Sequence, residues 1–308
     1  MKDKLFSGGK ISLGVMCVIL LFLAVAGLTE RAAAEDFTIV TTFTILEDFA
    51  AEVAGPDGDV RVISPVGAEV HEWELKPGNF VDIEEADVIF YNGLNVEQWM
   101  RQVKAVAGET PVIPVGEECD YPELPIITGE YAGETDPHIW MDPGGAISYV
   151  ELIRDKLIEH NPERADEYRR NAQEYIEKLE SLHERLKESF SVIPEQNRVL
   201  LTTEAAFIYF AEAYRFEHDG VWGTNTEQEG TPGQMKRIME IVEERAPGGI
   251  FWESTGSDRY VRSISADTGV PVYGPLYVDS VAKSGSDADD YIGMMETNVE
   301  LLREVLGP

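Results

Sequence analysis

One long stretch at the middle of the chain carries apolar residues with a helical period. In residues 161–190 these residues recur at spacings of three and four, which places them on one face of an α-helix. Asn161 and Pro162 are residue types favoured at the N-cap and at the first helical position. Such a helix would be roughly 43 Å long at 1.5 Å per residue. The pattern predicts either a strut that joins two lobes or an ordinary amphipathic helix packed on one domain.

Shorter patterns fill the first half of the chain. Runs rich in β-branched residues predict strands, and apolar residues at helical spacing predict the helices between them. The predicted strands are residues 37–42, 60–65, 88–91 and 111–115. The predicted helices are residues 44–53, 80–86, 96–107 and about 145–160, and residues 117–134 are predicted to form a loop.

The second half repeats this alternation. Its predicted strands are residues 198–203, 217–222, 249–253 and 270–274. Its predicted helices are residues 205–214, 231–245, 259–268 and 291–306, the second of which opens with a capping box from Thr231 to Gln234. Strands that alternate with helices on so short a cycle indicate βαβ units. We therefore predict an α/β fold of two lobes, each a mainly parallel sheet flanked by helices, joined by one long rigid helix.

Residues 1–34 have the pattern of an export signal. Three lysines precede an apolar run that extends from Ile11 to Leu28. Ala32 to Ala34 then offer the small residues of a cleavage site. We predict a signal peptide at residues 1–34, an N-terminal lobe at 35–160, a linking helix at 161–190 and a C-terminal lobe at 191–308. An uncleaved membrane anchor is the alternative, because the apolar run is slightly long for a signal.

Composition narrows the class of protein. The 308 residues are 44% hydrophobic, which is enough for one large domain or two ordinary ones. The formal net charge of −32 argues against nucleic acid as a partner, since phosphate binding needs a basic face. Cleavage after residue 34 would remove Cys17 and leave Cys119, so that neither an internal disulfide nor a thiolate metal site would be possible. We expect a monomer whose acidic surface is an ordinary solvated one that favours solubility, and long-range attraction of cations is the alternative interpretation of this charge.

Four residues at the ends of predicted strands, or in the loops that follow, have side chains that bind metals. His71 and His138 belong to the first half, and Glu204 and Asp279 belong to the second. Ligands of open parallel sheets bind beyond the carboxyl ends of the strands, which is the reason to group these residues. Two imidazoles and two carboxylates suit Mn(II), Fe(II) or Zn(II). The pattern suggests one metal ion held between the two lobes.

Each of these residues also has a simpler interpretation. A single histidine on a loop is often solvated or hydrogen-bonded, Glu204 could pair with an arginine or a backbone donor, and Asp279 could cap the next segment. His160 and His183 fall on predicted helices and are expected at the surface. His218 has no partner at ligand spacing unless Asp219 supplies one, so we leave these three histidines outside the candidate site.

Four motifs in one order carry a family resemblance. They are residues 136–143 (DPHIWMDP), 202–207 (TTEAAF), 225–232 (NTEQEGTP) and 277–280 (YVDS). Together they resemble the metal-binding solute receptors of bacterial zinc and manganese ABC importers, from about residue 37 to the C-terminus. The resemblance implies two lobes joined by a rigid helix, a metal ion in the cleft, a membrane permease as partner, and a place outside the cytoplasmic membrane. Carried over residue by residue, it implies the ligands His71, His138, Glu204 and Asp279.

Two variations within that family favour Mn(II). Many members have histidine at the third ligand position, whereas this chain has Glu204, as manganese- and iron-type receptors do. The histidine-rich loop of many zinc-type members is replaced here by the acidic residues 117–134. The first ligand motif departs from the common Asp-Pro-His pattern, because the chain reads Glu69-Val70-His71-Glu72, which makes Glu72 a further candidate ligand.

Other functions remain as alternatives at this point. A zinc- or iron-specific receptor, or a metal-buffering or adhesion protein, could use the same scaffold. A metal-dependent enzyme is disfavoured, because the segment that begins at His71 is not an HExxH motif, and neither a Ser-His-Asp arrangement nor a phosphate-binding glycine loop is recognised. We predict a receptor that captures Mn(II) and delivers it to a permease.

Overall fold

The computed structural model describes residues 37–224 and 230–308. The predicted signal peptide, residues 1–34, and most of the motif at residues 225–232 lie outside the described residues. Among the helices that are described, none is both long and apolar enough to cross a membrane. The described chain from residue 37 onward forms one compact unit.

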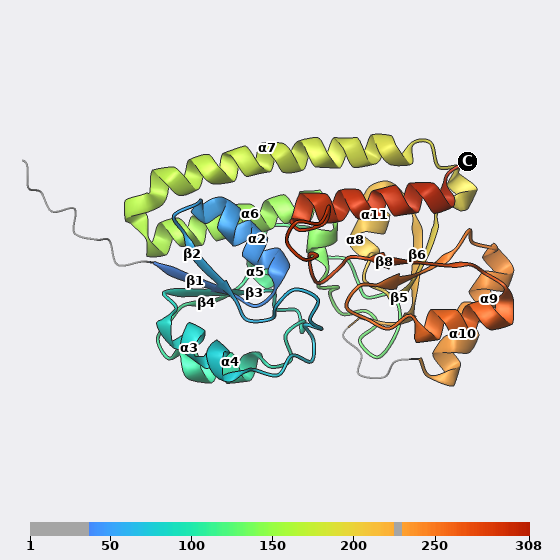
Figure 1. Ribbon diagram of the computed structural model, residues 1–308, viewed down its shortest axis with the longest axis horizontal. Coiled ribbons are helices and arrows are strands. Elements are labelled where there is room, and N and C mark those ends of the chain that lie inside the picture. Colours follow the sequence, from blue (N-terminus) through green and yellow to red (C-terminus); the bar gives the residue numbers. More distant parts are fainter. Residues whose placement is uncertain (1–36, 225–229) are drawn as a thin grey trace, which may run out of the picture. The chain divides into compact units, whose positions relative to one another are not determined.

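Two separate four-stranded parallel sheets form the centres of the two lobes (Figure 1). The first sheet has the order β2-β1-β3-β4 and the second has the order β6-β5-β7-β8, and every neighbouring pair of strands is parallel. The strands are β1 (Thr38–Thr41), β2 (Asp59–Val62), β3 (Val88–Tyr91), β4 (Val112–Pro114), β5 (Val199–Glu204), β6 (Glu217–Trp222), β7 (Ile250–Glu253) and β8 (Val272–Leu276). The predicted fold class is confirmed.

Helices connect and cover these strands. They are α2 (Thr44–Ala54), α3 (Pro77–Glu85), α4 (Met100–Ala107), α5 (Val115–Glu118), α6 (Pro143–His160), α7 (Ala165–Phe190), α8 (Ile208–Tyr214), α9 (Pro232–Arg245), α10 (Arg259–Thr268) and α11 (Tyr291–Leu306). Short 3-10 turns occur at Ile139–Met141, Pro162–Arg164 and Glu195–Asn197. The predicted capping box is present at the start of α9, where Thr231 Oγ1 accepts from the Gln234 amide and Gln234 Oε1 accepts from the Thr231 amide.

The long helix α7 contacts both lobes. It packs against α2 and α6 on the side of the first sheet and against α8 and α11 on the side of the second (Figure 1). The predicted apolar stripe is buried from Tyr168 to Phe190, while Ala165 is half-buried. The prediction that one helix starts at Asn161 is wrong. A 3-10 turn from Pro162 to Arg164 precedes the α-helix. Asn161 makes no capping bond, and its side-chain amide donates to the Tyr168 hydroxyl instead.

Several predicted boundaries shift for local reasons. The helix predicted at residues 96–107 begins only at Met100, after a turn in which Leu94 and Asn95 adopt positive φ angles of 50° and 65° and Glu97 accepts from the Asn92 amide and the Thr42 hydroxyl. The helix predicted at residues 205–214 begins at Ile208, and the predicted strand at residues 60–65 ends at Val62. These shifts lengthen the loops that leave the strands, and three of the four candidate ligands lie in loops.

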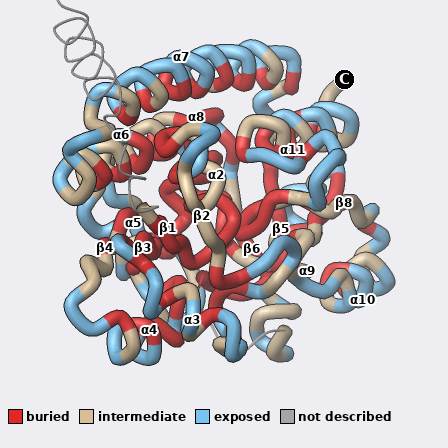
Figure 2. The backbone as a smooth tube through the Cα atoms, turned by 60° about the vertical axis from the view of Figure 1, so that its left-hand side comes forward, coloured by how far each residue is buried: buried red, intermediate tan, exposed pale blue. Residues whose placement is uncertain are grey.

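One hydrophobic core runs through both lobes. It joins Phe49 of α2, Leu179 of α7, Phe207 beside α8 and Met294 of α11, all of which are fully buried. Two smaller clusters cover the outer faces of the sheets, under α3 and α4 in the first lobe and under α9 and α10 in the second. Figure 2 shows the buried positions along the strands and on the inner side of α7. Because the lobes share packed side chains through α7, a wide rotation of one lobe would have to break this core.

Candidate metal centre

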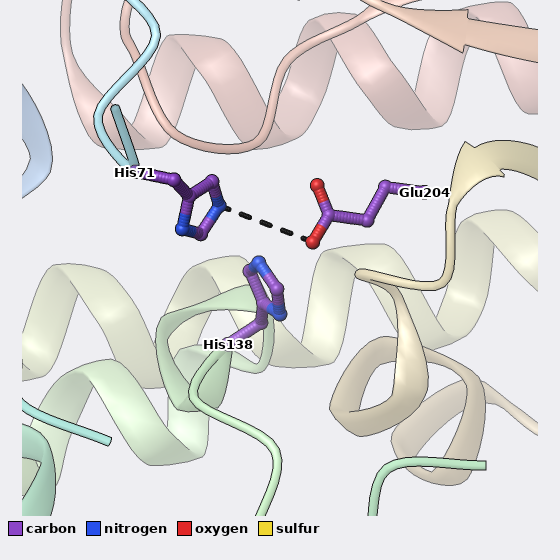
Figure 3. A group of neighbouring side chains, drawn as sticks. All are labelled: His71, His138 and Glu204. Carbon is purple, nitrogen blue, oxygen red and sulfur yellow. Dashed lines mark ion pairs between the residues drawn. The ribbon is translucent and has the colours of Figure 1, made fainter. Parts of the chain in front are cut away.

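The four candidate ligands meet between the two sheets. His71 lies in the loop after β2, His138 directly before the 3-10 turn at Ile139–Met141, Glu204 at the last position of β5, and Asp279 in the loop after β8. Figure 3 shows the two imidazole rings and the Glu204 carboxylate pointing toward one another. Residues that are more than two hundred positions apart in sequence therefore face one small volume.

His71 is held on its loop by the first lobe. The Trp99 indole donates to the Val70 carbonyl at 2.7 Å, and the ring nitrogen Nδ1 of His71 lies 3.1 Å from the Val96 carbonyl. A carbonyl can only accept, so Nδ1 carries a proton, and in the neutral ring Nε2 presents its lone pair to the site. This tautomer is the one that can bind a cation through Nε2.

His138 is held in the same way by a carboxylate. Oδ1 of Asp136 accepts from the His138 backbone amide at 3.0 Å and lies 3.2 Å from its Nδ1, and Oδ2 accepts from the Thr224 hydroxyl at 2.9 Å. The His138 ring also lies against Trp140, with centroids 5.0 Å apart. Carboxylate-histidine pairs of this kind orient an imidazole and raise its basicity as a metal ligand.

The two carboxylates come from the second lobe. The backbone amide of Glu204 donates to Oε1 of Glu253 at 3.2 Å, which fixes the end of β5. The loop that carries Asp279 is tied by its neighbour Val278, whose carbonyl accepts from the Trp140 indole at 3.0 Å. Asp279 does not cap the next helix, because the N-cap of α11 is Asp290.

Distances between the ligand atoms fit a single small cation. Nε2 of His71 lies 3.9 Å from Oε1 of Glu204 and 3.9 Å from Oδ2 of Asp279, while Nε2 of His138 lies 3.7 Å from Oδ1 of Asp279. A tetrahedral ion with bonds of about 2.1 Å would hold its ligand atoms about 3.4 Å apart. A contraction of a few tenths of an ångström, through side-chain rotation, would bring these three pairs of atoms to that spacing.

Three buried atoms of the site have no hydrogen-bond partner among the described residues. They are Nε2 of His71, Nε2 of His138 and Oδ1 of Asp279. Burying an unpaired acceptor costs about 1–3 kcal/mol, so three of them at one point are expected only where another group completes them. Two imidazole lone pairs and an anionic oxygen are completed together by a cation.

Local electrostatics also favour positive charge at this point. Burial lowers the pKa of His71, but the carboxylates of Glu204, Asp279 and Glu69 overcome it and raise that pKa to about 9. The pKa of His138 is shifted in the same direction: burial lowers it, and Asp136 together with Glu204 and Asp279 outweighs burial, so that the pKa is raised. Burial raises the pKa of Glu253 well above its usual value and that of Glu69 to about 7.

The other histidines have different surroundings. Both ring nitrogens of His218 are bonded to the backbone, since Nδ1 lies 3.0 Å from the Leu200 carbonyl and Nε2 accepts from the Phe207 amide at 3.1 Å. His183, expected at the surface, is half-buried and lies 3.1 Å from the Tyr214 hydroxyl and 3.3 Å from Asp142. Its position on α7 faces α8 and the start of α6, which the helical pattern alone could not reveal.

The first ligand motif pointed to Glu72, and no motif pointed to Glu69, Asp136 or Glu253 as part of the site. Glu72 is exposed, whereas Glu69 and Glu253 line a cavity of about 20 Å³ together with Glu204 and Asp279. One signal for two of the missed residues is present in the sequence, because each candidate histidine has an acidic residue two positions before it. Glu253 carries no such signal, since only the pairing of β7 with β5 brings it beside Glu204.

Comparisons with known proteins give one consistent result. Residues 39–305 match the family model described as zinc-uptake complex component A, periplasmic. The manganese-binding lipoprotein MntA of Halalkalibacterium halodurans is 37% identical over 289 residues, which cover 93% of this chain and 95% of that protein. The iron-binding protein YfeA of Yersinia pestis is 38% identical over 274 residues, which cover 89% of this chain and 88% of that protein.

A solved structure agrees in fold. The periplasmic zinc-binding protein TroA of Treponema pallidum superimposes with a TM-score of 0.82 at 26% identity, covering 89% of this chain and all of that one. This chain therefore shares its two sheets and their helices with a protein that is described as zinc-binding. MntA is described as manganese-binding and YfeA as iron-binding.

Proposed function

We propose, on the premise that this chain belongs to the zinc-uptake complex component A family, that His71, His138, Glu204 and Asp279 capture a divalent metal ion for import. The chain is a substrate-binding protein of the metal ABC importers, and the ion is its cargo rather than a resident cofactor. The observation that carries the ligand assignment is the convergence of three buried, unpartnered atoms with the Glu204 carboxylate at one point.

Mn(II) is the cargo that we propose first. Two carboxylates beside two imidazoles form a harder ligand set than one rich in histidine, and the manganese-binding relative MntA is 37% identical. Zn(II) and Fe(II) remain the alternative cargoes, in line with the descriptions of TroA and YfeA. Intrinsic affinity follows the Irving-Williams order, so Zn(II) should bind at least as tightly in vitro whatever the physiological ion is.

Calorimetry on metal-stripped protein tests the ligand assignment. Mn(II) should bind with a stoichiometry of one, and Glu204→Gln or Asp279→Asn should abolish measurable binding because each removes one anionic ligand. Glu240→Gln on the exposed face of α9 is the control and should bind as the wild type does. Equal affinity of all three variants would refute the proposed site.

Delivery to a permease separates transport from buffering. We propose that the protein acts outside the cytoplasmic membrane, with residues 1–34 as its export signal, and hands the ion to the membrane component of an ABC importer. Deleting the gene should abolish high-affinity uptake of radioactive manganese, whereas a buffering or adhesion protein would leave uptake intact. Sequencing the N-terminus of the exported protein distinguishes a cleaved signal from an uncleaved anchor.

The proposed role involves no catalysis and only small movements. We propose that the protein is a monomer without enzymatic activity, divided into lobes at residues 35–160 and 191–308 with residues 161–190 as the link. The core shared through α7 supports release by loop movements near Glu204 and Asp279 rather than by wide closure. Crystal structures with and without metal test this, and a large rotation of one lobe would contradict it.

A further inference from the structure

Each candidate histidine follows an acidic residue by two positions, and both acids bind the backbone in the same way. Oε1 of Glu69 accepts from the His71 amide at 3.1 Å, and Oδ1 of Asp136 accepts from the His138 amide at 3.0 Å. In both loops this bond fixes the backbone turn that presents the imidazole. The two acids therefore begin from equivalent positions.

Their remaining contacts differ. The Asp136 carboxylate turns away from the cation site, where it lies beside His138 Nδ1 and accepts from Thr224, and it is fully buried. The Glu69 carboxylate does not hold the ring of His71, because the Val96 carbonyl already lies beside Nδ1 of that ring. Its side chain is also one methylene longer, so the carboxylate can extend past its own loop.

The Glu69 carboxylate extends into the cation site. One of its oxygens lies within 4.8 Å of a ring nitrogen of His71 and of a carboxylate oxygen of Asp279. Glu69 also lines the small cavity shared by Glu204 and Asp279, whose volume of about 20 Å³ has room for about one water-sized sphere. Nε2 of His71 and Oδ1 of Asp279, both buried, lack partners beside it.

We propose that Glu69 supplies a fifth ligand, a carboxylate oxygen, to the metal ion bound by His71, His138, Glu204 and Asp279. This inference rests on the proposed function and extends it to the coordination number. A third carboxylate adds a hard oxygen ligand and makes the site anionic overall once a divalent ion is bound. Five or more ligands rich in oxygen suit Mn(II), whereas Zn(II) is satisfied by four in a tetrahedron. Glu69 thus shifts relative affinity toward Mn(II).

Three variants, titrated with Mn(II) and separately with Zn(II) by calorimetry on metal-stripped protein, test the proposal. Glu69→Gln keeps an oxygen for the His71 amide but removes the anionic ligand, and it should weaken Mn(II) binding about tenfold or more. The same change should weaken Zn(II) binding by about threefold or less. Glu69→Asp keeps the charge but shortens the side chain, so it should lose Mn(II) affinity as Glu69→Gln does.

Glu72→Gln is the matched control. It removes one negative charge from an exposed side chain three residues away in the same loop, and it should change neither affinity by more than about twofold. Equal effects of Glu69→Gln and Glu72→Gln would overturn the proposal, since general charge would then explain both. Wild-type behaviour of Glu69→Asp would overturn it too, because ligation requires reach as well as charge.

A crystal structure of the wild-type protein with Mn(II) decides the case independently of how the variants fold. Anomalous scattering should locate the ion with a Glu69 oxygen within about 2.4 Å, and a longer separation would refute ligation. Failure of the wild type and of every variant to bind any divalent ion would overturn the proposed function itself. Retained four-ligand binding with Glu69 remote would overturn only this inference.

Discussion

Two loops of the same design present the histidines of the cation site, and they differ in how firmly they hold them. Asp136-Pro137-His138 is fixed at both ring and backbone, with Asp136 bonded across the lobes to Thr224. Glu69-Val70-His71 has the same bond from acid to amide, but its ring is held by a neutral carbonyl and its backbone by an indole, both from the first lobe. Asp136 therefore supports the imidazole of its own loop, whereas the longer side chain of Glu69 can contact the ion.

This difference has a physical basis in the lengths of the side chains. Asp136 is too short to reach past its own histidine, so both of its oxygens are used within the protein. Glu69 forms the same backbone bond with one methylene more, and its carboxylate enters the cavity beside Asp279. One loop therefore contributes rigidity and the other contributes negative charge at the ion.

Among changes in these two loops, removal of either imidazole should have the largest effect on Mn(II) binding. His71→Ala and His138→Ala should each weaken Mn(II) binding by more than about 100-fold, which exceeds the usual effect of an outer partner. Both changes should also destabilise the metal-free protein. His138→Ala leaves the buried Asp136 carboxylate without its imidazole, and His71→Ala removes the ring whose positive charge the surrounding carboxylates favour. Calorimetry measures the affinities and urea unfolding the stabilities, and near-wild-type Mn(II) affinity of either variant would contradict its role as a ligand.

Removing the supporting acid should have the next largest effect. Asp136→Asn keeps the volume but loses the charge that orients and polarises His138, so Mn(II) affinity should fall by about 10–100-fold. Glu134→Gln, an exposed carboxylate of the same loop, is the control and should leave the affinity unchanged. An equal effect of the two changes would mean that Asp136 acts through its charge at a distance rather than through its contact.

The bond across the lobes should have a smaller effect. Thr224→Val removes the hydroxyl that donates to Asp136 and should lower both the Mn(II) affinity, by a few-fold, and the stability, by about 1 kcal/mol. Thr110→Val removes a hydroxyl that donates to the Ala86 carbonyl at 3.1 Å, far from the site. It should give a similar or smaller stability loss without any change in affinity, and a drop in its affinity would argue against the specific role of Thr224.

His218, a half-buried histidine outside the candidate site, should affect stability but not Mn(II) binding. Burial lowers the pKa of His218, whose two ring nitrogens are already bonded to the backbone. The unfolded chain then takes up the proton more readily than the folded one, so stability should fall as the pH drops below about 6.5. His218→Asn should be less stable at pH 7.5 but show a flatter decline between pH 7 and pH 5, with Mn(II) affinity at pH 7.5 unchanged. A decline as steep as that of the wild type would assign the acid sensitivity to other groups.

Local patterns were sufficient to predict the elements that depend on local physics. The strand Val88–Tyr91 and the helices Arg259–Thr268 and Tyr291–Leu306 have the predicted bounds, because β-branched runs and apolar spacing act within a few residues. Boundaries failed where the chain needed a tertiary reason. Leu94 and Asn95 take left-handed angles in a turn whose start the Asn92-Gly93 pair signals. The length of that turn depends on Glu97, which accepts from the Asn92 and Gly93 amides and from the distant Thr42 hydroxyl.

The sequence by itself determined the alternation of strands and helices, the long amphipathic helix, and the residue types able to hold a cation. Only the tertiary structure decided which atoms face that cation. The tautomer of His71 depends on the Val96 carbonyl, the orientation of His138 on Asp136 and Thr224, and the position of Glu253 on the pairing of β5 with β7. Glu69 and Glu72 are the same residue type three positions apart, and only packing brings the first to the ion and leaves the second in solvent.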